Sequence, residues 1–162
     1  MRLTHRPVAE QDLAAICAFT QSAAELFYCF PKADFPLTPG QLQAAIDQRS
    51  DSTVVLQEGA VVAFANFYRW ESGGVCAIGN VMVAPAARGR GVARYLIEQM
   101  LDTAFTRHQA SEVQVSCFNQ NVAGLLLYPQ LGFLPCGVEE RVGKSGERLA
   151  LIHFRLASPA CR

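Results

Sequence analysis

The sequence lacks an excess of charge of either sign, since fourteen lysines and arginines balance fourteen aspartates and glutamates. Without a global charge we expect neither a nucleic-acid partner nor binding to an anionic membrane. The sequence also lacks an apolar run of membrane-spanning length, and its first residues, MRLTHRPVAEQD, contain no apolar signal core. These absences predict a cytoplasmic protein with no membrane partner.

The sequence also has no C-x-x-C pair, and its three histidines, at positions 5, 108 and 153, are far apart. We therefore expect no metal site. Six cysteines occur at positions 17, 29, 76, 117, 136 and 161, several of them in apolar stretches where cysteine commonly acts as a small hydrophobic residue. We predict that they are reduced.

What the chain does contain is typical of a compact enzyme-sized fold: 162 residues, of which 51% are hydrophobic and 17% charged. No internal repeat or low-complexity linker appears, so we predict one domain over residues 1–162. Apolar spacing predicts strands at 2–6, 53–57, 60–70, 75–83, 112–118, 133–138 and 148–156. It predicts helices at 9–23, 38–49, 91–107 and 119–131, the second and fourth capped by Thr38 and Asn119, and leaves the segment 25–37 without a period.

This order, β-α-α-β-β-β-α-β-α-β-β, predicts the α/β (α+β) class, with a mixed sheet covered by helices. The strands at 75–83 and 112–118 are joined through a helix, so these two must run parallel.

The stretch from Asn80 to Leu96, NVMVAPAARGRGVARYL, joins a buried strand to a helix through a glycine- and arginine-rich turn. The free N–H groups at the start of such a helix, together with its dipole, favour an anion, most simply a pyrophosphate. A P-loop would need Lys and Ser or Thr after Gly91, and the dinucleotide fingerprint fails at Arg94. The alternative is a solvated basic turn that only caps the helix.

The turn resembles the coenzyme A loop of the GNAT superfamily of N-acetyltransferases, whose pattern is met by Arg88, Gly91 and Ala93. A second stretch, NVAGLLLYPQLGF from Asn121 to Phe133, is similar to another signature of the superfamily. The resemblance covers nearly the whole chain and implies a mixed, mostly antiparallel sheet of about six or seven strands flanked by about four helices. In ELFYCFPKADFP, FANFY, GNVMVAPAARGRGVARYLI and SCFNQNVAGLLLYPQLGF it is closest to bacterial members that acetylate the ε-amine of C-terminal lysines on peptides.

The resemblance implies that acetyl-CoA is the donor. Backbone groups at the end of the strand 75–83 should pair with the pantetheine arm and stabilise the oxyanion. The loop should wrap the pyrophosphate, the two asparagines should hold the pantetheine chain, and Tyr128 should protonate the leaving thiolate. The implied coenzyme residues are Val81, Met82, Val83, Arg88, Gly89, Arg90, Gly91, Val92, Ala93, Arg94, Asn119, Asn121, Leu125 and Tyr128.

Tyr128 has a simpler interpretation, because a tyrosine on the apolar face of a helix is commonly part of the core. Pro129 follows it directly and lacks an N–H, so the helix is expected to kink or end there, which affects where the Tyr128 hydroxyl points.

The base is not evident, because the strand VCAIGNVMV before the loop contains no acid. We expect deprotonation through ordered water with Ser116 as a catalytic relay, although a hydroxyl simply bonded within the sheet is the alternative. The nearest carboxylate is Glu25. The acceptor wall is expected to comprise Glu25, Phe27, Tyr28, Arg69, Trp70 and Asn80, with Arg69 or Lys32 available to a substrate carboxylate.

We therefore predict an acetyl-CoA-dependent N-acetyltransferase that moves an acetyl group to a primary amine by direct attack through a tetrahedral intermediate. The expected acceptor is the ε-amine of a lysine in a peptide or small molecule, and the protein is expected to be a monomer or homodimer. One alternative is a polyamine- or aminoglycoside-type acceptor, although the acceptor segments are poor in acids. The other is a coenzyme A-binding sensor without turnover.

Overall fold

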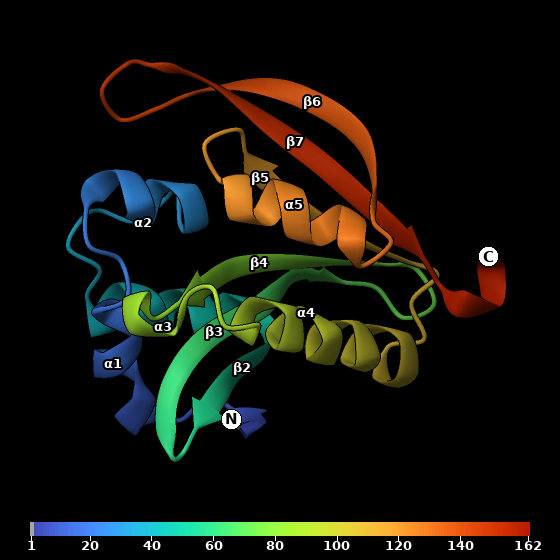
Figure 1. Cartoon of the computed structure of the whole chain (residues 1–162), viewed down its shortest axis with the longest axis horizontal. Coiled ribbons are helices and arrows are strands. Elements are labelled where there is room, and N and C mark those ends of the chain that lie inside the picture. Colours follow the sequence, from blue (N-terminus) through green and yellow to red (C-terminus); the bar gives the residue numbers. More distant parts are fainter. Residues whose placement is uncertain (1) are drawn as a thin grey trace.

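The computed structural model describes residues 2–162, and its seven strands form one sheet in the order β1-β2-β3-β4-β5-β7-β6 (Figure 1). Every neighbouring pair is antiparallel except β4 and β5, which are parallel as predicted. The strands are β1 (Leu3–Pro7), β2 (Ser50–Gln57), β3 (Ala60–Trp70), β4 (Val75–Val83), β5 (Glu112–Phe118), β6 (Leu134–Val142) and β7 (Arg148–Ala157).

Helices cover both faces of this sheet (Figure 1). The first three pack on one face through a cluster of buried side chains that includes Leu26, Phe64 and Met82. The last two pack on the other face through a cluster that includes Leu96 and Phe154. The helices are α1 (Leu13–Cys17), α2 (Ala23–Cys29), α3 (Pro39–Gln48), α4 (Val92–Asp102) and α5 (Val122–Gln130), one more than the resemblance implied. The mixed, mostly antiparallel fold is confirmed.

The N-terminal helix is where the prediction from the sequence is wrong. The predicted helix at 9–23 is a 3₁₀ turn followed by the short α1, and a separate helix, α2, lies in the segment that showed no period. Ser22 explains the break, because its hydroxyl accepts a hydrogen bond from the Glu25 N–H at 3.2 Å and so starts a new helix. The predicted cap of α3 is confirmed, since the Thr38 hydroxyl accepts from the Gln41 N–H.

β4 and β5 separate halfway along, and this opens the interior of the molecule. Their pairing runs from Val75 opposite Glu112 to Ile78 opposite Val115 and stops there. Two residues later Asn80 has φ +50°, and the register of β4 with β3 shifts at the same place. Such a bulge bends the strand, and asparagine is one of the few residues other than glycine that tolerate this backbone conformation. The rest of β4 therefore leaves β5 and exposes its own edge.

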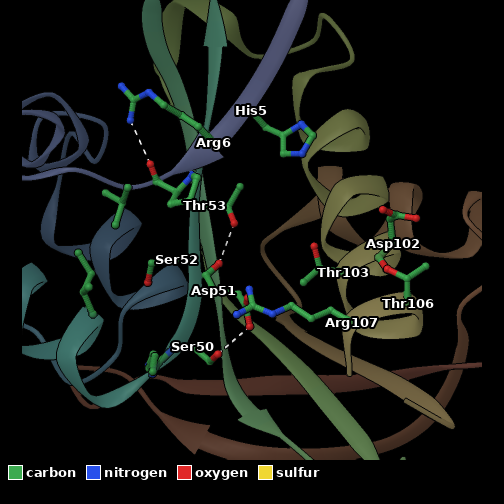
Figure 2. Close-up of a pocket in the computed structure, with 14 residues that line it drawn as sticks. His5, Arg6, Ser50, Asp51, Ser52, Thr53, Asp102, Thr103, Thr106 and Arg107 are labelled. Atoms are coloured by element: carbon green, nitrogen blue, oxygen red, sulfur yellow. Dashed lines mark hydrogen bonds and ion pairs between the residues drawn. The ribbon is translucent and has the colours of Figure 1, made fainter. Parts of the chain in front are cut away.

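Away from the gap between β4 and β5, Asp51 ties the start of β2 to the π-helical turn Thr103–Arg107 that follows α4 (Figure 2). Its nearly buried carboxylate accepts hydrogen bonds from the side chains of Arg107 and His108, each at 2.7 Å. A hollow of about 460 Å³ surrounds this tie, but its hydroxyl groups are largely satisfied, since Thr103 and Thr106 donate to the backbone of α4. The hollow therefore has a structural explanation.

Replacing Asp51 with asparagine should destabilise the protein by about 1–3 kcal/mol at neutral pH, because charge-assisted hydrogen bonds are lost. Asparagine tolerates the φ of +55° at this position, so backbone strain does not enter. Burial raises the pKa of Asp51, but hydrogen bonds from Ser50 and His108 outweigh it and hold the pKa below its ordinary value. A lowered folded-state pKa adds stability above the ordinary pKa of 3.8, and that stability is lost as the pH falls through the folded pKa.

Urea unfolding of wild type and variant at pH 7, 5 and 3 checks this expectation. The two curves should be well separated at pH 7 and should approach each other at pH 3. Asp102→Asn is the control, because that exposed carboxylate lines the same hollow without an ion pair among the residues described. Equal stability of wild type and Asp51→Asn at pH 7 would contradict the role of the tie.

Candidate active site

A cavity of about 780 Å³ lies where β4 and β5 separate, between α2, the start of α4 and α5. It brings together residues from segments that are far apart in the sequence. The predicted site residues that line it are Glu25, Tyr28, Asn80, Val81, Met82, Val83, Arg88, Gly89, Gly91, Val92, Ala93, Arg94, Ser116, Asn121 and Tyr128.

Some residues expected to form the acceptor wall do not line the cavity. Phe27 packs its ring 5.2 Å from that of Phe118. Arg69 donates to Glu71 at 2.6 Å in the turn after β3, and Trp70 is the last residue of β3. Arg69 and Trp70 lie opposite Ala77 and Cys76, where β4 is still paired with β5 and the gap has not opened. The residue of β3 that lines the cavity is Tyr68, at the register shift after Phe67.

Three expected coenzyme residues also lie outside the lining. Arg90 is exposed on the loop, and Leu125 packs against the core beneath α5. The Asn119 side chain accepts from the Ala150 N–H at 2.9 Å and so joins β5 to β7. The cap of α5 is Asn121 rather than Asn119, since the Asn121 side chain accepts a hydrogen bond of 3.0 Å from the Gly124 N–H.

The start of α4 is an anion-binding surface built from backbone. Gly91 is the N-terminal cap with φ +80°, and Gly89 has φ +75°, a conformation that favours glycine. No side chain caps this helix, and its first backbone bond is donated by Tyr95 to the Gly91 carbonyl. The N–H groups of the first turn therefore point into the cavity without a partner in the helix, at the positive end of the dipole. This arrangement fits a pyrophosphate.

The arginines of the loop brace it more than they project into the cavity. Arg88 donates to the carbonyls of Val83 and Phe19 at 3.2 and 3.3 Å, and pairs with Glu25 at 3.1 Å. It thereby joins the end of β4 to the segment before α2. Arg94 donates to Gln130 at 3.1 Å on α5. The backbone supplies the direct donors, and the arginines add positive charge and hold the loop against its neighbours.

Tyr128 reaches the cavity from α5 while its ring is packed in the core. The ring lies 5.7 Å from Phe133 and 5.8 Å from Phe154, and the side chain is 3% exposed. Among the residues described, none forms a hydrogen bond with the Tyr128 hydroxyl. The hydroxyl oxygen is not fully enclosed by protein, and it opens on the cavity. Burial raises the pKa of Tyr128 far above its ordinary value, so the phenol stays protonated. α5 continues past Pro129 to Gln130.

The edge of β4 supplies a backbone donor in the same cavity. Ala84 donates its N–H to Val62 on β3 at 2.8 Å. Because backbone groups of successive strand residues point to opposite sides, the Val83 N–H faces the gap that β5 has left. By the same alternation, the backbone of Met82 points toward β3. Val83 is thus the better placed of the two predicted donors.

A buried polar network, which the sequence did not reveal, ends at Arg49. The Arg49 guanidinium donates to Asn66 at 3.1 Å, and Asn66 in turn donates to Asn80 at the same distance. Asn80 donates to the carbonyl of Cys29 at the end of α2, so its side chain fixes that helix. Arg49 lies 5.5 Å from the centre of the Tyr68 ring, and both residues line the cavity.

A second group that the sequence did not reveal comes from β6 and β7. The Ser116 hydroxyl lies 2.6 Å from His153 Nδ1, and His153 Nε2 lies 3.0 Å from a carboxylate oxygen of Glu139. Ser116 and His153 both line the cavity. The predicted relay residue therefore has an imidazole partner.

The sheet thus splits beside the start of α4, and Tyr128 lies at the split. The chain belongs to the acetyltransferase (GNAT) family, whose model matches residues 16–133. It is an acetyl-CoA-dependent N-acetyltransferase that acts on an amine.

Solved structures extend the likeness over nearly the whole chain. YncA from Salmonella typhimurium, described as an acetyltransferase and solved with its cofactor acetyl-CoA, is 25% identical with a TM-score of 0.78, covering 96% of this chain and 93% of that one. A ribosomal-protein-alanine N-acetyltransferase from Brucella melitensis is 24% identical with a TM-score of 0.78, covering 95% and 99%. A spermidine N-acetyltransferase from Vibrio cholerae, in complex with CoA and spermine, is 20% identical with a TM-score of 0.81, covering 96% and 95%.

Two further features bear on partners. Within residues 2–162, the histidine, cysteine, aspartate and glutamate side chains form no group of three or more that could hold a metal ion. Over the same residues, no helix is both long and apolar enough to cross a membrane.

Proposed function

We propose that this enzyme acetylates the ε-amine of a lysine whose carboxylate is free, such as the C-terminal lysine of a peptide. The observation that carries the proposal is Arg49, a half-buried guanidinium in the cavity that forms no ion pair with any residue described. Burial lowers the pKa of Arg49, which reflects the cost of holding a cation in the protein without an adjacent carboxylate. A substrate carboxylate would offset that cost, and the planar guanidinium suits it.

The other charges of the cavity support an acceptor that carries negative charge. Glu25 is the one acidic residue of the lining, and it is already paired with Arg88. The basic residues of the lining are Lys32, Arg49, Arg88, Arg94 and Arg141. A polycationic acceptor would be repelled by this surface, and the likeness to a spermidine acetyltransferase supports the fold alone. A polyamine is therefore the weaker candidate.

The residues around the split divide the remaining work. The first turn of α4 binds the pyrophosphate, and the exposed edge of β4 aligns the pantetheine arm by strand-like hydrogen bonds. Acetyl-CoA supplies an activated thioester, whose carbonyl oxygen gains negative charge as the amine attacks. The Val83 N–H stabilises that charge, and Tyr128 gives its proton to the sulfur. Burial raises the pKa of Tyr128, so the phenol keeps its proton and is available as the donor when the sulfur gains negative charge.

Removing the charge of Arg49 tests the proposed acceptor. Arg49→Gln should raise KM for a peptide that ends in a free lysine by about 10–100-fold, the equivalent of a charge-assisted hydrogen bond, with little change in KM for acetyl-CoA. Arg49→Lys should restore only part of the affinity, because lysine lacks the planar fork.

The same peptide with a C-terminal amide is the matched control. Wild type should bind the amide as poorly as Arg49→Gln binds the acid, and the substitution should then have little further effect. If Arg49→Gln weakened the acid and the amide equally, Arg49 would act through the Asn66–Asn80 network and would not bind a carboxylate.

A further inference from the structure

Three side chains from three neighbouring strands form a continuous hydrogen-bonded chain that ends in the cavity. Ser116 on β5 and His153 on β7 are direct cross-strand partners, so they project from the same face of the sheet. Glu139 on β6 is paired with Leu151, two residues from His153, which places it diagonally on that face. The distances are 2.6 Å from Ser116 Oγ to His153 Nδ1 and 3.0 Å from His153 Nε2 to Glu139 Oε1.

Chemistry fixes the direction of these hydrogen bonds. Arg141 donates to Glu139 at 2.8 Å and, with His153, holds the pKa of that carboxyl below its usual range. An ionised carboxylate only accepts, so the proton of a neutral His153 ring resides on Nε2 and is donated to Glu139. Nδ1 is then an acceptor, and it faces the Ser116 hydroxyl. The chain is therefore set to remove a proton at the Ser116 end.

This chain lies on the opposite face of the sheet from Tyr128. Successive residues of β5 alternate between faces, and Val115 and Cys117 are buried in the cluster that contains Tyr128 and Phe154. Ser116 points the other way, toward the side covered by α2, and the gap between β4 and β5 connects the two sides. A proton donor on one face and a proton acceptor on the other would flank a substrate held in the gap.

We propose that His153, oriented by Glu139, takes the proton that the acceptor ammonium must lose, and that Ser116 delivers it. An N–H proton of the ammonium passes to Ser116 Oγ as the hydroxyl proton of Ser116 passes to His153 Nδ1. The freed nitrogen lone pair then attacks the thioester carbonyl, the C–S bond breaks, and coenzyme A leaves as the thiol with the proton of Tyr128. The second N–H proton is lost as the amide forms and replaces the one that Tyr128 gave, while the imidazolium, paired with Glu139, returns the first proton to solvent. The proposal rests on the lysine ε-amine proposed above as the acceptor, and it supplies the base that β4 lacks.

Single substitutions should separate the three roles at pH 7. His153→Ala and Ser116→Ala should each lower kcat for the amine by about 10²-fold, the usual worth of a positioned base. The double variant should be little worse than either, because the two residues act in one path. Added imidazole should restore part of the activity of His153→Ala and none of that of Ser116→Ala. Glu140→Gln is the matched control on β6, since Glu140 pairs with Arg148 away from the cavity, and it should leave kcat unchanged.

The pH profile gives a readout that a purely structural role would not move. The polar and titratable side chains that face the same cavity as His153, or contact it, come from three other elements. They are Glu139 and Arg141 of β6, Glu25 and Tyr28 of α2, and Ser116 of β5. Without the relay only free amine reacts, so in His153→Gln the rise of kcat/KM with pH should move toward the ordinary lysine pKa of about 10.4. An unchanged profile, or a failure of imidazole to rescue His153→Ala, would overturn the relay.

Nitrogen NMR of the His153 ring tests the relay without turnover and so separates it from the proposed acceptor. The expected spectrum of neutral His153 shows the proton on Nε2, and Glu139→Gln should shift protons toward Nδ1. A wild-type ring protonated on Nδ1 would overturn the relay even if lysine peptides are acetylated. Conversely, wild type that acetylates no amine would contradict the proposed function, while the ring spectrum still decides the relay. Rapid release of coenzyme A before amine is added would identify Ser116 as a nucleophile, and this result would also overturn the relay.

Discussion

Tyr128→Phe is expected to lower kcat by about 10²–10⁴-fold, which is the usual worth of a positioned general acid. The substitution keeps the ring that packs against Phe133 and Phe154, so neither the fold nor coenzyme affinity should change. It removes only the hydroxyl that opens on the cavity. Steady-state kinetics with a lysine-ended peptide and a titration with coenzyme A measure the two quantities separately.

The pH dependence of the same variant sharpens the test. Because burial raises the pKa of Tyr128 far above its ordinary value, wild type should show no loss of activity at high pH from ionisation of this phenol. Both proteins should keep the same ascending limb, because the base lies elsewhere. An unchanged kcat in Tyr128→Phe would show that the residue is only part of the core and that solvent protonates the thiolate.

Gly91→Val is expected to weaken coenzyme binding by about 10–100-fold. A β-branched side chain at φ +80° costs about 1–3 kcal/mol of backbone strain, which the loop relieves by leaving the conformation that aims its N–H groups at the pyrophosphate. Acetyl-CoA should raise the Tm of wild type strongly and that of the variant little, because a ligand stabilises only the state that binds it. NAD and ATP should have much less effect on either.

Gly146→Val is the matched control for this prediction. Gly146 has φ +83° in the turn between β6 and β7, and open space surrounds it as it surrounds Gly91. The strain introduced is therefore similar, but the position is not part of the cavity lining. Gly146→Val should lose stability and keep its affinity for coenzyme A. Equal affinity losses in both variants would show that the Gly91 effect is general destabilisation and not loss of the anion site.

The parts of the site that the sequence revealed are those whose residues are close together in the chain. The strand Val75–Val83, the turn with Gly89 and Gly91, and the following helix form one continuous segment, and turn residues with apolar periodicity are sufficient to predict it. Ser22 shows the opposite case, because its role as a cap could be predicted only if α2 were. The apolar side chains of α2 have different neighbours, since Leu26 packs in the cluster with Phe64 and Phe27 packs against Phe118, and they therefore show no helical period.

The residues that the sequence did not reveal depend on which strands become neighbours. His153 is 37 positions from Ser116, and only the pairing of β5 with β7 places them together. Arg49 looks like a basic residue at the end of a helix, and only the course of β3 and β4 shows that it lies over Tyr68 in the cavity. The pairing of β3 with β4 likewise shows that Trp70 lies where the gap has not opened, while Tyr68 lines the site.

The most direct test of the proposed function is a competition for a labelled acetyl group. Acetyl-CoA with a ¹³C-labelled acetyl group is mixed with the protein and equal amounts of a peptide ending in a free lysine, the same peptide ending in an amide, and spermidine. Fragment mass spectrometry then locates the label. We predict that it accumulates first on the ε-nitrogen of the lysine in the peptide with the free carboxylate. Preferential labelling of spermidine, or equal labelling of the two peptides, would contradict the proposal that Arg49 selects an acceptor carrying a carboxylate.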